Sequence, residues 1–198
     1  MTEIKVLGIL GSPRHEGNSE IMLDHALKGA RDSKASINKV SLYDLDFYGC
    51  TECNDCFESG ECSLTDDMDE VYEAIELADR IILAAPIFFM SLPAQTKAMI
   101  DRCQRYWAIK YALKQSFPRP LNAPGRYAAY IGIGGTSGSR LFDGTMLTLK
   151  YFFDAIDMQP LEDHYLLVRG VDGRGDINEN RDSLQDAYEL GKFIVDLE

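Results

Sequence analysis

KVLGILGSPRHEGNS, residues 5–19, decides the fold of this chain of 198 residues. Its apolar first part, Lys5–Leu10, predicts a buried β-strand that ends at Gly11. From Asn18 onward the apolar residues recur at helical spacing, which predicts a helix over residues 18–34. The stretch therefore indicates a strand, a glycine-containing loop and a helix in succession.

The same alternation continues along the rest of the chain. Five strands that alternate with helices predict an α/β fold, in which a parallel sheet is covered by helices on both faces. We expect a single domain over residues 1–198. Ligands of such sheets bind beyond the carboxyl ends of the strands, where the strand order reverses, so the loops after the first, third and fourth strands should carry function. Further strands are predicted over residues 35–42, 80–85, 126–133 and 161–168, further helices over 66–77, 93–111, 139–158 and 180–197, and a loop over 115–125.

The first loop, residues 11–19, has the composition of an anion site. It matches neither GxGxxG nor GxxxxGK, but it places glycines, hydroxyls and an arginine directly before a helix. Backbone N–H groups at a helix N-terminus bind oxyanions, and a terminal phosphate monoester fits better than a diphosphate without a GxG. The alternative is an ordinary strand-to-helix turn with Asn18 as N-cap. The candidate phosphate contacts are Ser12, Arg14, Asn18 and Ser19.

The loops after the third and fourth strands suit a flat ring. Large apolar side chains at a sheet edge can form a wall for an aromatic ligand. A loop folded back into the core and an oligomer interface are alternatives for this segment. Clustered glycines after the fourth strand allow close backbone approach to a planar group, although a plain turn has the same composition. The candidates are Pro86, Ile87, Phe88 and Phe89 in the first of these loops and Gly135, Thr136 and Ser137 in the second.

Composition and charge exclude several classes of function. The chain has 20 basic and 32 acidic residues and a net charge of −12, so its surface repels nucleic acids and anionic lipids. No apolar run approaches the ~20 residues that span a bilayer. The N-terminus lacks the pattern of a signal peptide. We expect a cytoplasmic protein that binds neither nucleic acid nor membrane.

Four of the five cysteines lie in an insertion at about residues 48–65 and follow the pattern CxxCxxCx5C. In a reducing compartment such clusters favour metal or redox chemistry over structural disulfides. The close spacing of the first three favours a [4Fe–4S] cluster, whereas structural zinc usually takes two separated pairs. Zinc and a cluster-free thiol or disulfide loop remain alternatives. Cys103 is predicted to be a buried small apolar residue and Trp107 to pack in the core or an interface. The candidate metal ligands are Cys50, Cys53, Cys56 and Cys62.

Together these motifs resemble the NADPH-dependent FMN reductase family of flavodoxin-like proteins. The resemblance implies a three-layer sandwich with a five-stranded parallel sheet in the order 2-1-3-4-5, and a bound FMN. It implies that the phosphate contacts the four candidates of the first loop and that the ring lies against the candidates of the other two loops. The matching segments are Gly11–Arg14 with Gly17–Ser19, Ala78–Ile82 with Ala85–Phe89, and Lys97–Arg102.

The cysteine spacing, with Asp66-Asp67-Met68 after it, resembles the iron–sulfur flavoprotein branch of that family. This branch implies electron transfer between a [4Fe–4S] cluster and FMN, a ferredoxin-like donor or NAD(P)H, and a small acceptor such as a quinone or an oxygen species. It also implies a homodimer or homotetramer in which a cluster faces the flavin of a neighbouring subunit. The alternatives are a cluster-free NAD(P)H-dependent FMN or quinone reductase, and a flavodoxin-like electron carrier or redox sensor. Because a flavin performs its own chemistry, no catalytic side chain is predicted.

Overall fold

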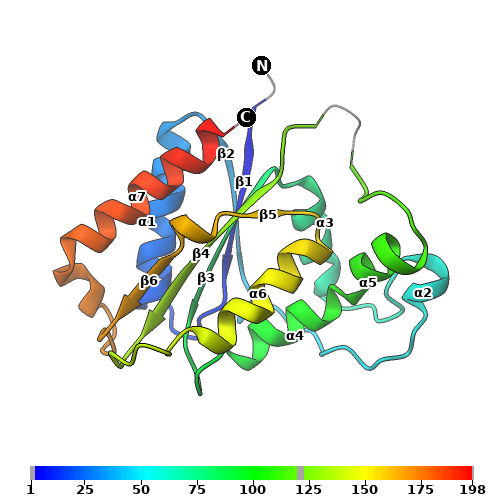
Figure 1. Ribbon diagram of the computed structural model, residues 1–198, viewed down its shortest axis with the longest axis horizontal. Helices are drawn as coiled ribbons and strands as arrows, with labels where there is room; N and C mark the ends of the chain where they lie inside the picture. The colour runs from blue at the N-terminus through cyan, green and yellow to red at the C-terminus, as the bar shows by residue number, and fades with distance from the viewer. Residues whose placement is uncertain (1–2, 120–122, 198) are drawn as a thin grey trace.

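The computed structural model describes residues 3–119 and 123–197, and this part of the chain forms one twisted parallel sheet between two layers of helices (Figure 1). The strand order is β2-β1-β3-β4-β5, and a short sixth strand, β6, also pairs with β4. The predicted parallel sheet with helices on both faces is therefore confirmed. The strands are β1 (Lys5–Leu10), β2 (Ser36–Ser41), β3 (Arg80–Pro86), β4 (Tyr127–Gly134), β5 (Gln159–Pro160) and β6 (Leu166–Arg169).

Each face of the sheet has its own apolar core. Along β3, Ile82 and Ala84 pack in the core beneath α1 and α7, whereas Ile81 and Leu83 pack in the core beneath α3, α4 and α6. Burial on both faces explains why β3 reads as a continuous apolar run rather than an alternating one. The helices with their bounds are α1 (Asn18–Asp32), α2 (Cys56–Ser59), α3 (Met68–Leu77), α4 (Ala94–Arg102), α5 (Gln104–Trp107), α6 (Asp143–Ala155) and α7 (Arg181–Asp196), with a π-helix η1 (Ala108–Ala112) and 3₁₀ turns η2 (Glu162–His164) and η3 (Asp176–Glu179).

The predicted fifth strand, residues 161–168, is wrong in its details. Only β6 begins within that range, because β5 ends at Pro160 after pairing with Tyr127 and Ala128, and pairing with β4 resumes only at Leu166 opposite Ile131. Residues 161–165 therefore face only residues 129–130 of β4, and the extra length forms η2. The ring of Tyr165 packs edge-on against that of Tyr130, with centroids 6.1 Å apart.

The predicted helix over residues 93–111 is divided into α4, α5 and η1. The division falls at Cys103, whose N–H is shared between the carbonyls of Met99 and Ile100, as is common where a helix tightens at its end. The predicted loop over residues 115–125 includes residues 120–122, which lie outside the described part. Among the helices that are described, none has the length and apolar character needed to cross a membrane.

Helices α1 and α7 approach so closely that two glycines replace side chains at their contact. A Cβ added to Gly191 would lie 1.8 Å from the carbonyl oxygen of Ala26, and one added to Gly29 would lie 2.0 Å from that of Tyr188. Both obstacles are backbone atoms, which cannot rotate away as a side chain can. The backbones themselves therefore form this helix–helix contact.

We predict that Gly191→Ala destabilises the fold, although alanine is the better helix former by about 1 kcal/mol. Overpacking of this kind costs about 1–3 kcal/mol, so urea unfolding of the ligand-free protein should give a lower free energy of unfolding. Gly138→Ala is the control, because a methyl group there meets no described atom within 4 Å. Equal stabilities of the two variants would contradict the contact.

Candidate functional site

The three predicted loops meet at the carboxyl edge of the sheet. β1 pairs with β2 on one side and with β3 on the other, so the strand order reverses between β1 and β3. The loops are joined at their bases, since Gly11 N–H donates to the Ala84 carbonyl at 2.8 Å and Ile87 N–H donates to the Ile133 carbonyl at 2.8 Å. This edge is where ligands of open α/β sheets bind.

The first loop leaves the N-terminus of α1 open. Gly17 is the N-cap, and among the described residues no side-chain cap bond satisfies the first turn. The Asn18 side chain points elsewhere: its Nδ2 donates to the Gly173 carbonyl at 2.8 Å, and its Oδ1 accepts the Ile177 N–H at 3.2 Å. The alternative of Asn18 as N-cap is therefore wrong. The free N–H groups of the first turn, beside the buried Ser12 and Ser19, fit an oxyanion.

Residues 170–177 connect the first loop, which follows β1, to the third loop, which follows β4. The sequence did not reveal this role. Arg14 Nη1 donates to the Asp172 carbonyl at 2.9 Å, and Gly170 N–H donates to the Thr136 carbonyl at 3.2 Å. Gly135 lies so close that an added Cβ would be 2.8 Å from the Asp172 carboxylate. The richness of this segment in Gly and Asp is typical of a loop, but nothing local indicates its partners. Gly135, Thr136 and Ser137 themselves are exposed.

The second loop, which follows β3, ends in a strained and exposed turn. Phe88 and Ser91 exchange backbone hydrogen bonds of 2.9 and 3.0 Å, which makes Phe89 and Met90 a two-residue turn. Both have positive φ, 48° and 64°, a conformation that such turns usually give to Asn and Gly. Phe89 is 105% exposed, so the alternative of a loop folded back into the core is wrong for this turn. Strain of about 1 kcal/mol per residue persists most often at functional sites. The preceding Ile87 is half-buried against the core.

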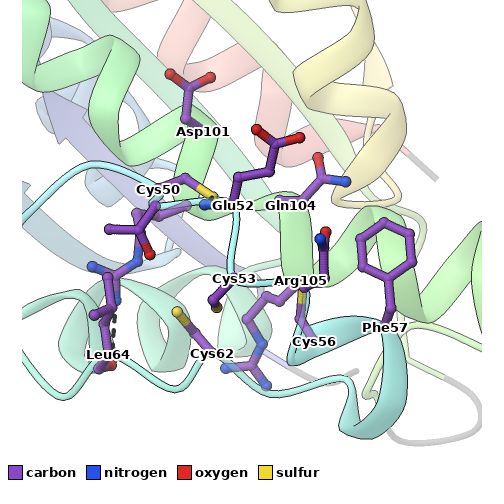
Figure 2. Close-up of a pocket in the computed structure, with 13 residues that line it drawn as sticks. Cys50, Glu52, Cys53, Cys56, Phe57, Cys62, Leu64, Asp101, Gln104 and Arg105 are labelled. Carbon is purple, nitrogen blue, oxygen red and sulfur yellow. Dashed lines mark hydrogen bonds between the residues drawn. The ribbon is translucent and has the colours of Figure 1, made fainter.

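The four clustered cysteines line one pocket of about 370 Å³, between residues 50–64 and the C-terminal end of α4 (Figure 2). Cys56 begins α2, Cys50 and Cys53 lie on the loop before it, and Cys62 lies after it. Two non-glycine residues of that loop, Glu52 and Asn54, have positive φ. The backbone therefore winds around the pocket. Cys103 is only 2% exposed and packs in the core, as predicted, outside the pocket.

The four thiols are near one another without forming a closed ligand set. Cys53 Sγ lies 3.3 Å from Ser63 Oγ, and Cys50 Sγ accepts the Glu52 N–H at 3.4 Å. Within residues 3–119 and 123–197, no group of three or more His, Cys, Asp or Glu side chains is arranged to hold a metal ion as it stands. Burial raises the pKa of the Cys56 thiol, and the neighbouring Cys50, Cys62 and Cys53 raise it further. A bound cation would relieve that mutual repulsion.

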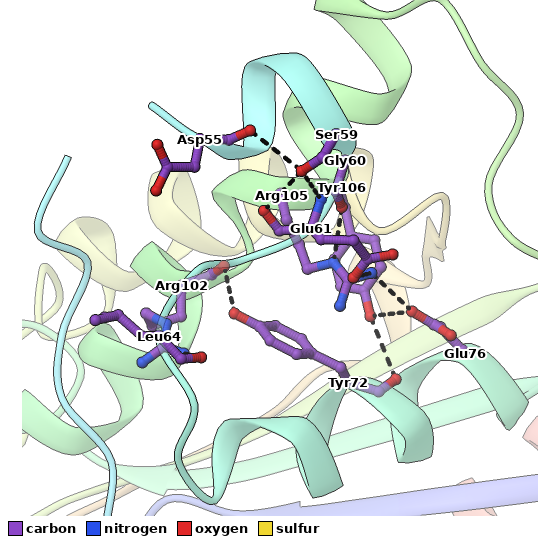
Figure 3. A network of polar contacts seen from close by, with 10 residues as sticks. All are labelled: Asp55, Ser59, Gly60, Glu61, Leu64, Tyr72, Glu76, Arg102, Arg105 and Tyr106. Atoms are coloured by element: carbon purple, nitrogen blue, oxygen red, sulfur yellow. Dashed lines mark hydrogen bonds and ion pairs between the residues drawn. The ribbon is translucent and has the colours of Figure 1, made fainter. Parts of the chain in front are cut away.

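Arg105 anchors the cysteine segment, residues 50–62, to the helical layer (Figure 3). Its Nε donates to the Gly60 carbonyl at 3.1 Å, and its Nη2 lies 2.5 Å from the Glu61 carboxylate. Its guanidinium stacks 4.6 Å from the ring centroid of Tyr72, whose hydroxyl donates to the Arg102 carbonyl at 3.0 Å. The pocket is thus attached to rigid elements although its own backbone is mostly irregular.

Aromatic side chains lie exposed beside the pocket. Trp107 forms tilted ring contacts with Phe57, at a centroid distance of 5.7 Å, and with Tyr111, at 5.5 Å. It is 39% exposed, so of the two environments predicted for it the core is wrong and an interface remains a prediction.

Residues 4–172 match the NADPH-dependent FMN reductase family. The chain belongs to this family. It is 43% identical over 103 residues to an iron-sulfur flavoprotein of Archaeoglobus fulgidus, a match that covers 52% of the chain and 47% of that relative. An iron-sulfur flavoprotein of Methanocaldococcus jannaschii is 30% identical over 161 residues, covering 80% of the chain and 75% of the relative. These relatives confirm the family and the branch that the motifs resemble. The chain spans about half the length of the first of them.

The flavodoxin-like fold is confirmed by structural comparison. An NAD(P)H:quinone oxidoreductase from Methanothermobacter marburgensis superposes with a TM-score of 0.70 at 17% identity, over 96% of each chain. At so low a sequence identity, the similarity shows a shared fold and carries no argument about activity.

We predict that Phe89→Asn with Met90→Gly stabilises the protein and weakens ligand binding. The pair suits a turn with positive φ, so relief of strain should raise the free energy of unfolding by about 1–2 kcal/mol. Removal of both apolar side chains should weaken FMN binding several-fold, measured by quenching of FMN fluorescence. Unchanged FMN affinity would show that the strained turn has no role in binding.

Proposed function

We propose that the chain is an FMN-dependent oxidoreductase of the iron–sulfur flavoprotein type. In this proposal a [4Fe–4S] cluster on Cys50, Cys53, Cys56 and Cys62 exchanges electrons with FMN at the carboxyl edge of the sheet. The observation that carries it is the gathering of these four thiols in one pocket, in a chain that belongs to an FMN reductase family.

The flavin site is built from backbone more than from charge. The open N-terminus of α1, with Ser12, Ser19 and Arg14, would hold the phosphate, and Asn18 would support the loop from behind through residues 173–177. The ring would lie against Pro86, Ile87, Phe88 and Phe89 and the exposed third loop, Gly135, Thr136 and Ser137. FMN supplies the electron chemistry when bound, and these residues position it and exclude water.

The donor set of the pocket suits iron and sulfide. Four soft thiolates can converge on one cluster, and the pattern CxxCxxCx5C supplies them from one short segment. Zinc remains the alternative occupant, although its structural sites usually take ligands from separated pairs. The cysteines would move from their present partners, such as Ser63, to ligate the metal.

The two sites lie at opposite ends of α4. The loop after β3 leads into Ala94 at the start of α4, and Arg102 at its end lines the cysteine pocket. Nine residues of helix, about 12 Å from end to end, therefore separate the two sites. The described residues that line the pocket include none of the proposed flavin contacts. We therefore propose a homodimer or homotetramer in which a pocket approaches a flavin of another subunit. Exposed Phe57, Trp107 and Tyr111 beside the pocket suit such an interface.

The donor and the acceptor follow from the same proposal. A ferredoxin-like protein or NAD(P)H would supply electrons, and a quinone or an oxygen species would receive them in the cytoplasm. The NADPH-dependent FMN reductase family, to which the chain belongs, favours a second candidate, a cluster-free NAD(P)H-dependent reductase.

Protein purified without oxygen should contain FMN and about four iron and four sulfide per chain, because four thiolates complete one cubane. Cys56→Ser should lose most of the iron and keep FMN, as metal analysis and flavin absorbance can measure. The control is Cys103→Ala, which removes a cysteine outside the pocket and should keep both. Zinc in place of iron, or no metal in the wild-type protein, would refute the cluster.

Stopped-flow bleaching of the flavin separates the two candidate functions. With a cluster as relay, reduced ferredoxin should bleach the wild-type flavin rapidly, and Cys56→Ser should slow this at least tenfold. Equal rates in the two proteins, or bleaching by NADPH that Cys56→Ser does not slow, would favour the cluster-free reductase.

A further inference from the structure

Arg102, the last residue of α4, places a buried positive charge on the wall of the cysteine pocket. Its side chain is 0% exposed, and it lines the same cavity as the four cysteines. Its Nη1 donates to Asp66 at 2.7 Å and to the Tyr48 carbonyl at 3.0 Å. Its Nη2 donates to Asp66 at 3.1 Å and to the Leu64 carbonyl at 3.4 Å. These acceptors lie on both sides of the cysteine segment, so one guanidinium holds the two ends together.

One donor of this guanidinium is left without an acceptor. Arg102 Nε is buried and has no hydrogen-bond partner among the described residues. A buried donor left unpaired costs about 1–3 kcal/mol. The other four guanidinium N–H groups face Asp66 and backbone carbonyls. The Nε–H therefore remains available to an acceptor.

The charge of Arg102 persists in spite of its burial. Burial alone lowers the pKa of Arg102, but its hydrogen bond to Asp66, and then Tyr72 and Cys62, raise that pKa well above its ordinary value. Asp66 pairs with the guanidinium and is not among the described residues that line the pocket. The pocket thus faces the cationic side of the pair. The other arginine of the wall, Arg105, differs because its Nε is bound to Gly60 and its charge is paired with Glu61 and Glu76.

We propose that Arg102 is a positioning residue that sets the reduction potential of the metal centre held by the four cysteines, through its buried charge and its free Nε–H. This inference rests on the proposed function. One electron arriving from the donor adds one negative charge to the centre, and the same electron later leaves for FMN without any bond or proton at Arg102. A fixed cation, and an Nε–H that would donate to a sulfur of the centre, favour the more negative, reduced state and so raise the potential.

A pair of variants with opposite charge effects tests this inference. Arg102→Gln keeps hydrogen-bond donors and removes the cation, so the potential should fall. Asp66→Asn keeps an acceptor and removes the counter-charge, so the potential should rise. Each shift should correspond to at least a tenfold change in the reduction equilibrium, which is about 59 mV for one electron. Dye-mediated redox titration followed by electron paramagnetic resonance gives the potential, and metal analysis gives the occupancy.

The controls separate tuning from simple support of the loop. Arg140→Gln removes an equal charge from a side chain that is 84% exposed and should leave the potential unchanged. Arg102→Lys keeps the charge without the fork and should retain a potential closer to the wild type than Arg102→Gln does. If Arg102→Gln loses its iron, Asp66→Asn and Arg102→Lys still decide the question.

Four outcomes overturn the inference. Iron-containing variants with the wild-type potential, or with shifts in the same direction for Arg102→Gln and Asp66→Asn, would refute it and leave the proposed function intact. Loss of iron from all three pocket variants would make Arg102 a purely structural residue. A wild-type protein without iron would refute both proposals together.

Discussion

The strand order reverses at β1, which lies between β2 and β3, and this reversal determines where ligands can bind. Both faces of the sheet are covered by helices, so only its edges are open to ligands. At the carboxyl edge the reversal separates the loops after β1 and β3, which leaves a crevice between them. The loop after β4 and residues 170–177 close the same edge from the other side. The proposed flavin contacts all depend on this one topological feature.

Helix α4 extends that constraint to the cysteines. It begins beside the strained turn at Phe89 and Met90 and ends at Arg102 in the pocket wall. Buried charges are costly unless they are paired and hydrogen-bonded. Arg102 and Arg105 meet that requirement largely by donating to backbone carbonyls within the cysteine segment and on both sides of it. An irregular segment is thereby held against regular helices, as a metal site requires if its ligands are to converge.

The sequence was sufficient for the features that depend on local pattern. The strands before Gly11 and Pro86 and the cysteine spacing were all predictable, because apolar runs and ligand motifs are contiguous. Long-range partners were not predictable. The interruption between β5 and β6 depends on register against β4, and the attachment of Asn18 to residues 173–177 joins positions more than 150 residues apart. The burial of Arg102 depends likewise on Asp66, 36 residues away, and an arginine at a helix end usually faces solvent.

The central claim is that one pocket holds an iron–sulfur cluster in a chain whose sheet edge holds FMN. Diffraction from crystals of anaerobically purified protein, collected above and below the iron absorption edge, tests it most directly. The account predicts a compact anomalous peak from iron between Cys50, Cys53, Cys56 and Cys62, and flavin density at the loops after β1, β3 and β4. A peak that appears only above the zinc edge, or a pocket without anomalous signal in a protein that holds flavin, would contradict it.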